Sequence, residues 1–464
     1  MEQRDTLVIL PWGNPAYWRE VTYRLGEDGE LSERFCTTLP LLLRRYPGAT
    51  VAILALDSLV DEVRKPPERP SACWSCYERL AGSIRSASQA VSYQELASRL
   101  EAFVAEYAKC LVGGQCQAEI RPIVCPAVGR PGGVWRFSGR ARDFEAVALY
   151  GLGELLAGRA YRRIVLDTSH GVNFMPAIAM RLAARLAGVL LAAHEELLEP
   201  EGGGVEVVVY NSDPVLSQAT PDQLFNVNLV ARERHQVLPL QPPVPSKLLD
   251  PLEKPSGGLE EEVSAINREY MGAVRLAISS LYYPMPLALA YAVAKDARPL
   301  RSREVMRKAY SVWAGSVEIR EAEVTRKVSL NPDAVYLLLL VHAVSTRVKG
   351  MGVGYPADVG RLEGLAKLYK AVNACYYYLI EDELGRVRRG EVRGGGWAPL
   401  AEVLGEQPAS KQPSVDKRVM IAHAGLQKEF VLVRATEGGG RLLKYIDDWD
   451  GDLEERLRSG GLIL

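Results

Sequence analysis

Six residues near the C-terminus, Arg418 to His423, contain the two side-chain types that a ribonuclease without a metal ion needs. Histidine titrates near neutral pH and can transfer protons, whereas arginine keeps its charge and donates paired hydrogen bonds to phosphate oxygens. The segment is therefore a candidate catalytic site, with His423 in proton transfer and Arg418 stabilising charge on phosphoryl oxygens. The spacing also occurs by chance, so the alternative is a surface arginine near a packed histidine.

The spacing of the two residues constrains how such a site could form. Five positions along an ideal helix rotate by about 140°, so Arg418 and His423 would not share a helix face. One of them must lie at a helix start, or the site must draw on two protomers. His342 and Arg347 have the same spacing in reverse order at the end of an apolar run. We expect no catalytic role for that second pair.

A second group of polar residues lies near the N-terminus, in two loops that follow expected strands. One loop contains Trp12, Gly13 and Asn14, and the other runs from Asp167 to Asn173 into a helix. Asn173 is expected to cap that helix, and a helix start with polar donors suits a phosphate. The chain has no G-x-G-x-x-G after its first strand, so a dinucleotide coenzyme is not expected.

The elements around these loops predict an α/β, Rossmann-like domain. Apolar strands are expected near 7–10, 51–56, 120–124, 164–167 and 205–210, and helices near 32–46, 90–109, 142–157 and 174–193. This alternation predicts a parallel sheet covered by helices on both faces. With the strand order 3-2-1-4-5, the first and fourth strands are neighbours, and their loops flank the crevice where such sheets bind ligands.

The rest of the chain predicts a mainly helical part behind a linker. We expect the sheet domain at 1–215, a proline-rich linker at 216–258, a helical middle segment at 259–345 and a second domain at 346–464. An apolar stripe from Leu362 to Leu379 predicts one helix. A glycine-rich loop that ends at Trp397 is expected to carry four arginines, namely Arg386, Arg388, Arg389 and Arg393. A strand pair near 430–433 and 442–445 and a final helix follow.

Composition limits the possible partners. The 464 residues include 56 Lys and Arg against 57 Asp and Glu, so nucleic-acid contacts must come from local patches. No signal peptide precedes the first strand, and Arg181 and Arg185 interrupt the longest apolar helix. We therefore expect a cytoplasmic protein that makes no membrane contact.

The chain has seven cysteines, and three interpretations of its C-x-x-C motif are possible. Cys73 and Cys76 form a single C-x-x-C motif, which could hold free thiols, a structural disulfide or a metal ion. The chain has 8 asparagines and 42 arginines against 14 lysines. Scarce asparagine suits a thermophile, and proteins of thermophilic archaea can carry disulfides inside the cell.

The residues from Ile164 to Asn173 resemble the strand-4 motif of CARF domains, the Rossmann-like sensors of type III CRISPR systems. The residues around Tyr23, from Phe35 to Thr38 and from Ile53 to Val60 are similar in pattern to the same family. The segment from Arg418 to Gly425 resembles the catalytic segment of HEPN ribonucleases, which accompany CARF domains. The resemblance covers about the first 210 and the last 100 residues and leaves 259–345 unmatched.

This resemblance implies a homodimer that senses cyclic oligoadenylate, most simply cyclic tetra-adenylate, across its two CARF domains. Activation would lead to metal-independent cleavage of single-stranded RNA in antiviral defence, leaving a 2′,3′-cyclic phosphate, with the catalytic helices paired across the dimer. Many members have a polar residue where this chain has Val419. The implied ligand contacts are Trp12, Gly13, Asn14, Ser169, His170, Gly171 and Asn173, with Thr37 and Thr38 as weaker candidates.

Two other functions are open. One is a CARF transcription regulator without nuclease activity, with a winged helix-turn-helix in the unmatched middle segment. The other is a ring nuclease that degrades cyclic oligoadenylate in the CARF domain, with Ser169 or His170 near the scissile bond.

Overall fold

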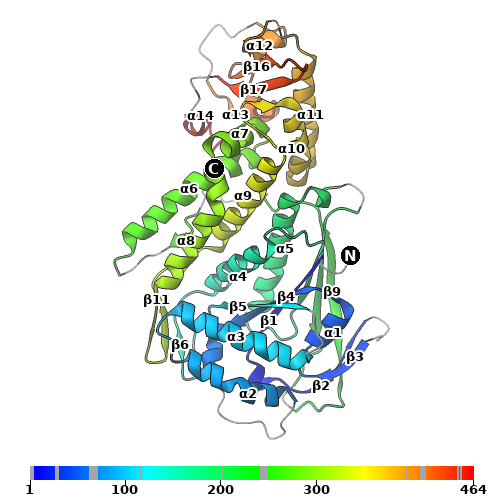
Figure 1. Ribbon diagram of the computed structural model, residues 1–464, viewed down its shortest axis with the longest axis vertical. Helices are drawn as coiled ribbons and strands as arrows, with labels where there is room; N and C mark the ends of the chain where they lie inside the picture. The colour runs from blue at the N-terminus through cyan, green and yellow to red at the C-terminus, as the bar shows by residue number, and fades with distance from the viewer. Residues whose placement is uncertain are drawn as a thin grey trace.

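The computed structural model is elongated, with a large sheet domain at one end, a small sheet at the other and long helices between them (Figure 1). The structure describes residues 5–464 except 27–30, 62–71, 114–117, 200–201, 217, 241–248, 254, 256, 393, 408–413, 447–448 and 450–451.

Five neighbouring parallel strands form one side of an eight-stranded sheet. In spatial order they are β5 (Glu119–Cys125), β4 (Thr50–Leu56), β1 (Thr6–Trp12), β7 (Arg163–Asp167) and β8 (Val205–Ser212). β1 pairs with both β4 and β7, with Leu7 opposite Thr50 on one side and Ile164 on the other. The expected α/β fold and strand order are therefore confirmed. Continuous apolar runs such as that of β4 suit strands that are covered on both faces.

Three further strands extend the sheet beyond β8. β9 (Leu224–His235) pairs with β8 antiparallel, and β2 (Val21–Leu25) joins β9 to the edge strand β3 (Leu31–Phe35). The helix expected at 32–46 was wrong in its first part, because α1 begins only at Leu39 and ends at Arg45. Along residues 31–35, half-buried and exposed side chains alternate, which suits an edge strand with one covered face. The segment expected as a linker, 216–258, includes β9.

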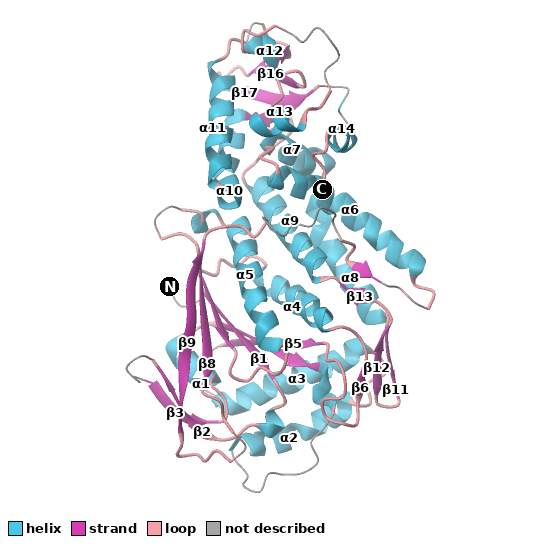
Figure 2. Cartoon of the chain, turned by 180° about the vertical axis from the view of Figure 1, so that it is seen from behind, coloured by secondary structure: helices cyan, strands magenta, loops and turns pink. Residues whose placement is uncertain are grey.

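Helices cover both faces of the sheet. α2 (Ala72–Ala87) and α3 (Tyr93–Val112) lie on one face, and α4 (Ala141–Leu156) and α5 (Met175–Ala193) lie on the other (Figure 2). Among the described helices, α5 alone is long and apolar enough to cross a membrane, but most of it is buried inside the protein. Its Arg181 and Arg185 form ion pairs with the buried Glu145 of α4. These properties are those of a core helix.

Two disulfides fasten α2 to its neighbours. Cys73 pairs with Cys36, which precedes α1, and Cys76 pairs with Cys110 of α3. The two cysteines of the C-x-x-C motif therefore have different partners, and the disulfide reading holds for both. Cys125 is a buried free thiol and Cys375 an exposed one.

Removing these bridges should destabilise the sheet domain. The disulfides join residues 37 and 34 positions apart, and cross-links of this span typically contribute about 2–4 kcal/mol by limiting the unfolded chain. We expect a reducing agent to lower the unfolding temperature of the natural protein but not that of a variant with Ser at all four positions. Cys375→Ser is the matched control. An unfolding temperature of the natural protein that does not change when the reducing agent is added would contradict both disulfides.

Four helices, three of them long, connect the sheet domain to the far end of the molecule. They are α6 (Glu260–Tyr282), α7 (Pro286–Tyr291), α8 (Ser302–Gly315) and α9 (Pro332–Gly350). α9 lies between α4 and α5 on one side and α6 and α8 on the other. His342 and Arg347 lie on α9, and Arg347 is only 6% exposed. Arg347 therefore lies inside this packed layer of helices, and His342 is half-buried.

A hairpin fastens this helical segment to the sheet domain. It consists of β11 (Val317–Arg320) and β12 (Glu323–Arg326), and β12 pairs in parallel with β6 (Arg136–Phe137). At its end Arg326 forms an ion pair with Asp57, and both side chains are almost fully buried. Burial raises the pKa of Asp57, although Arg326 and the backbone N–H of Ala127 oppose this rise.

The apolar stripe forms two helices in place of the one expected. α10 (Val359–Val372) ends before Asn373, whose side chain accepts a hydrogen bond from the backbone of Cys375 (2.9 Å) and caps α11 (Ala374–Arg389). The stripe therefore stops at Val372, and Cys375 is exposed. The expected glycine-rich arginine loop was also wrong, because Arg386, Arg388 and Arg389 form the last turn of α11. Arg393 lies outside the described residues.

A small sheet and three short helices complete the chain. Its strands, in spatial order, are β14 (Ala357–Asp358), β17 (Arg441–Tyr445), β16 (Val431–Ala435) and β15 (Ala398–Pro399). The expected C-terminal strand pair is confirmed as β16 and β17. The helices are α12 (Leu400–Val403), α13 (Lys417–Ala422) and α14 (Leu453–Ser459), and α13 carries the candidate catalytic segment.

Candidate active site and sensor site

Helix α13 is short, and its two ends carry Arg418 and His423. Asp416 begins the helix by accepting hydrogen bonds from the backbone N–H groups of Arg418 (2.8 Å) and Val419 (3.1 Å). Arg418 is thus the second residue of the helix, and His423 directly follows its last residue. Arg418 therefore lies at a helix start, and His423 lies just beyond the helix end.

Behind His423 the chain turns sharply. Ala424 and Gly425 both have left-handed backbone angles, with φ of 50° and 75°. A Cβ on Gly425 would lie 2.9 Å from Cβ of Met285, so this position requires glycine both sterically and conformationally. The turn directs the following residues back past His423.

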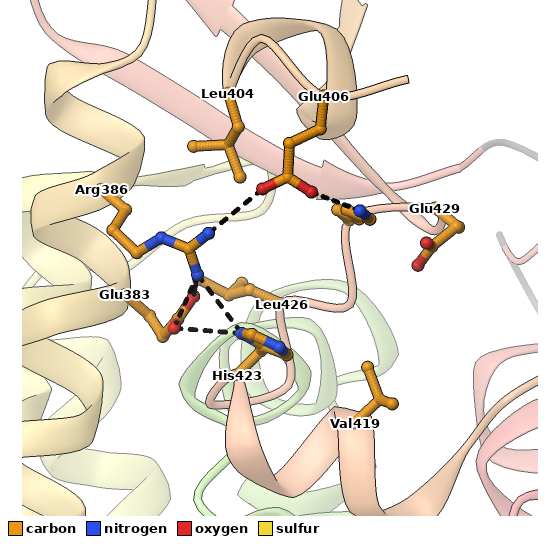
Figure 3. Close-up of a pocket in the computed structure, with 9 residues that line it drawn as sticks. Glu383, Arg386, Leu404, Glu406, Val419, His423, Leu426 and Glu429 are labelled. Atoms are coloured by element: carbon orange, nitrogen blue, oxygen red, sulfur yellow. Dashed lines mark hydrogen bonds and ion pairs between the residues drawn. The ribbon is translucent and has the colours of Figure 1, made fainter. Parts of the chain in front are cut away.

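A pocket of about 360 Å³ opens beside the histidine (Figure 3). Four segments that are separated in the sequence form its wall: α11, the loop after α12, α13 and the segment before β16. Its lining residues are Glu383, Arg386, Leu404, Glu406, Val419, His423, Leu426, Lys428 and Glu429.

Glu383 holds the imidazole of His423. Its carboxylate lies 3.0 Å from Nδ1 of His423 and accepts hydrogen bonds from Arg386 at 3.0 and 3.2 Å. An ionised carboxylate only accepts hydrogen bonds, so we assign a proton to Nδ1, which leaves Nε2 for a substrate. The Glu383 side chain is 9% exposed and that of His423 is 40% exposed. A nearly buried carboxylate therefore orients a histidine that a ligand can reach.

Two further charges complete the pocket. Glu406 accepts a hydrogen bond from Arg386 at 3.3 Å and pairs with Lys428 (Figure 3). The hydrogen bond from Lys428 holds the pKa of Glu406 below its usual value, and the same contact raises the pKa of Lys428. At neutral pH the pocket therefore places two fixed positive charges near His423, each balanced by a carboxylate.

Arg418 lies outside this pocket. Its side chain is exposed, and it forms no hydrogen bond or ion pair with any other described residue. One chain alone thus does not bring Arg418 and His423 into one cavity. The second option from the sequence, a site shared by two protomers, agrees with this geometry.

Sequence reasoning missed most of the residues around His423. Arg386 was noticed but was assigned to a loop, while Glu383, Glu406 and Lys428 were not noticed. Glu383 and Arg386 are three positions apart on a helix, a spacing that a correct helix assignment would have revealed. We found no signal in the sequence for Glu406 or Lys428.

Replacing Glu383 should slow RNA cleavage without preventing it. Glu383→Gln keeps the size of the side chain but removes the charge that faces Nδ1 of His423, so we expect kcat to fall by about tenfold or more with KM little changed. Glu381→Gln, an exposed change on the same helix, is the matched control. Equal kcat values for the two variants would show that Glu383 has no part in the reaction.

At the other end of the molecule, the expected sensor loops lie side by side. The N–H of Gly13 after β1 donates to the carbonyl oxygen of His170 after β7 at 2.8 Å. A Cβ on Gly13 would lie 2.7 Å from Cγ1 of Val172, so only glycine allows this approach. The neighbouring strands thus bring the two loops together at the carboxyl edge of the sheet.

Several of the expected ligand contacts are buried. The side chains of Trp12, Thr37 and Thr38 have almost no exposed surface, and Thr38 donates to the buried Asp167. The ring of His170 lies 4.6 Å from that of Trp18, and burial lowers the pKa of His170 to about 3. These groups can shape the loops but are not free to contact a ligand as the loops now stand.

Of the remaining candidates, Gly13 is buried, Asn14, Ser169 and Gly171 are half-buried, and Asn173 is exposed. Ser169 donates to Asp167 and accepts from the backbone N–H of Ser212 (2.8 Å), whereas Asn173 is exposed. The expectation that Asn173 caps α5 was wrong. It has a left-handed backbone (φ 53°), and Phe174 occupies the cap position. Asn14, Ser169, Gly171 and Asn173 therefore form the accessible part of the candidate sensor site.

The fold and the two sites define a class of protein, namely a Rossmann-like sensor joined to a nuclease domain with a histidine and arginine motif. Comparison with known proteins agrees with this class. The family model of the CARF domain of CRISPR system endoribonuclease Csx1 matches residues 7–214, and the model of its HEPN domain matches residues 373–447. Together the two models cover well over half of the chain.

The chain is also similar over nearly its whole length to a curated protein, the CRISPR system endoribonuclease Csx1 of Methanocaldococcus jannaschii. The two are 21% identical over 459 residues, which cover 91% of this chain and 85% of that protein. The chain thus belongs to the Csx1 family of CRISPR endoribonucleases, with a CARF sensor domain and a HEPN domain. Its partners are accordingly an RNA and a signalling ligand.

Proposed function

We propose that this endoribonuclease cleaves single-stranded RNA without a metal ion after cyclic oligoadenylate, most simply cyclic tetra-adenylate, binds across the CARF domains of a homodimer. The observation that carries the proposal is the contact between His423 and Glu383 in a pocket that also contains Arg386 and Lys428. The residues described include no group of three or more His, Cys, Asp or Glu side chains placed to hold a metal.

The reaction would be attack of a ribose 2′-hydroxyl on the adjacent phosphorus. The new bond joins the 2′-oxygen to phosphorus, the bond to the 5′-oxygen breaks, and the products end in a 2′,3′-cyclic phosphate and a 5′-hydroxyl. Nε2 of His423 would accept the 2′-hydroxyl proton or supply one to the departing 5′-oxygen. Arg418 would stabilise the charge on the phosphoryl oxygens. Solvent water would make the other proton transfer.

The two alternative functions have less support. A winged helix-turn-helix regulator would need a free wing, whereas the β11–β12 hairpin pairs with β6 and is fastened through Arg326 and Asp57. A ring nuclease in the CARF domain would need a reactive side chain there. His170 is half-buried and its low pKa makes it a weak base, and Ser169 is engaged by Asp167 and Ser212.

A cleavage assay separates these functions. Labelled single-stranded and double-stranded RNA would be incubated with the protein, with and without cyclic tri-, tetra- and hexa-adenylate, and with and without EDTA. We expect EDTA-resistant cleavage of the single strand only with a cyclic oligoadenylate. Loss of the cyclic oligoadenylate without RNA cleavage would favour a ring nuclease, and cleavage restored by a divalent ion after chelation would contradict the metal-free mechanism.

Removing the accessible polar side chains of the sensor loops should weaken ligand binding. For Ser169→Ala combined with Asn173→Ala we expect the Kd for cyclic tetra-adenylate to rise at least about tenfold, or roughly 1.4 kcal/mol. Calorimetry with the purified protein measures this directly. Gln89→Ala, a change in the exposed turn between α2 and α3, is the control. Unchanged affinity of the double variant would place the ligand elsewhere.

A further inference from the structure

The side chain of Trp397 lies beside two positive charges on the small sheet. The guanidinium carbon of Arg434 is 4.9 Å from its ring centroid, and the Lys444 ammonium is 4.8 Å from it. The strand register explains this grouping. Ala398 on β15 is opposite Val433 on β16, which places Trp397 beside Arg434, and Lys444 on β17 is opposite Leu432.

These residues share one face of the sheet. Along β16 and β17, Val431, Val433, Leu443 and Tyr445 are buried, and the alternating residues between them are half-buried. Side chains alternate between the two faces of a strand, so the half-buried residues point outward together. We call this outward surface the Trp397 face; it consists of Trp397, Leu432, Arg434, Leu442 and Lys444.

The loop before Trp397 leaves the approach to the ring open. A Cβ placed on Gly395 or Gly396 would meet no atom within 4 Å, and neither residue has a left-handed backbone angle. Neither packing nor backbone geometry therefore requires glycine at these positions. Glycine does allow a ligand to come close to the backbone.

The Trp397 face lies close to the catalytic pocket along the chain. Lys428 and Glu429 line the pocket, and β16 begins two residues later at Val431. An extended chain rises about 3.3 Å per residue, so Arg434 lies at most about 20 Å from Lys428 along the backbone. A few nucleotides of a single strand can span this distance.

We propose that the Trp397 face binds the RNA strand outside the catalytic pocket, with a base stacked on Trp397 and phosphates near Arg434 and Lys444. Aromatic rings on a sheet face, flanked by cations, suit single-stranded nucleic acid, because every base has a face that can stack and every phosphate is negative. The whole chain has a net charge of -1, so RNA attraction must come from local sites of this kind. The nearby carboxylate of Asp358 is engaged as the cap of α10.

This inference rests on the proposed cleavage of single-stranded RNA, but binding can be measured without cleavage. The substitutions on the Trp397 face would be made in a protein that also carries His423→Ala and cannot cleave. The Kd for a 20-nucleotide single-stranded RNA would then be measured at several salt concentrations. We expect Trp397→Ala to raise the Kd at least about tenfold. For Arg434→Gln with Lys444→Gln, we expect a weaker salt dependence of binding. The negative slope of the logarithm of the association constant against log salt should become about 1.4 less steep, since each single-strand phosphate contact contributes about 0.7.

Two controls make the outcome decisive. Arg320→Gln removes an exposed arginine from the β11–β12 hairpin and should leave both Kd and slope unchanged. The paired Arg434 and Lys444 variant keeps Trp397, so it tests the face even if Trp397→Ala fails to fold. If the Arg434→Gln and Lys444→Gln protein has the same Kd for RNA and the same salt dependence as the protein with both residues intact, the proposal is overturned. This holds whatever result Trp397→Ala gives. If the natural protein binds RNA through this face but does not cleave it, the proposed function fails while this inference stands.

Discussion

His423→Ala should abolish ligand-activated RNA cleavage, with a loss of about 10²–10⁴-fold or more in rate. General acid–base groups typically contribute this much, and His423 is the only histidine among the residues that line the pocket. The measurement is the initial rate of cleavage of a labelled single strand at saturating cyclic oligoadenylate. The products should end in a 2′,3′-cyclic phosphate, as mass spectrometry would show.

The same variant should keep its fold, its dimer and its affinity for the activator. The CARF loops and α13 lie at opposite ends of the molecule (Figure 1), so a change at one end should not disturb the other. His235→Ala, at the end of β9, is the matched control for loss of a histidine. Full cleavage by the His423→Ala protein would mean that the active site lies elsewhere.

Arg418→Ala should be nearly as damaging. Its fixed charge can stabilise negative charge on the phosphoryl oxygens, and an interaction of this kind acts mainly in the transition state, so kcat should fall more than KM rises. Combining it with His423→Ala should add little, because residues that act in one step fail together. Arg456→Ala, which removes an exposed arginine from α14, is the control.

The exposed position of Arg418 leads to a sharper test. If each site combines Arg418 of one protomer with His423 of the other, mixing the Arg418→Ala and His423→Ala proteins creates dimers with one intact pair. After subunit exchange, activity should return to about a quarter of the natural level, because about half of the dimers are mixed. Mixtures as inactive as their components would exclude this division of the site.

The sequence alone determined the architecture of the sensor domain and indicated both candidate sites. Continuous apolar strands separated by amphipathic helices are a local pattern, and burial on both faces leaves few ways to arrange them. The order of the five neighbouring parallel strands and the meeting of the loops at Gly13 and His170 follow from that pattern. The motif from Arg418 to His423 is likewise visible without coordinates.

Only the tertiary structure decided which groups surround these residues. Glu383, Glu406 and Lys428 reach His423 from separate segments, and no periodicity links residues that meet through the packing of different elements. The same holds for the pairing of β9 with β2 and for the disulfide partners of Cys73 and Cys76. The break at Asn373 shows the other limit. There the side chain of Asn373 caps a new helix within a regular apolar stripe. That helix extends to Arg389, so Arg386 lies on a helix beside the pocket and not in the expected loop.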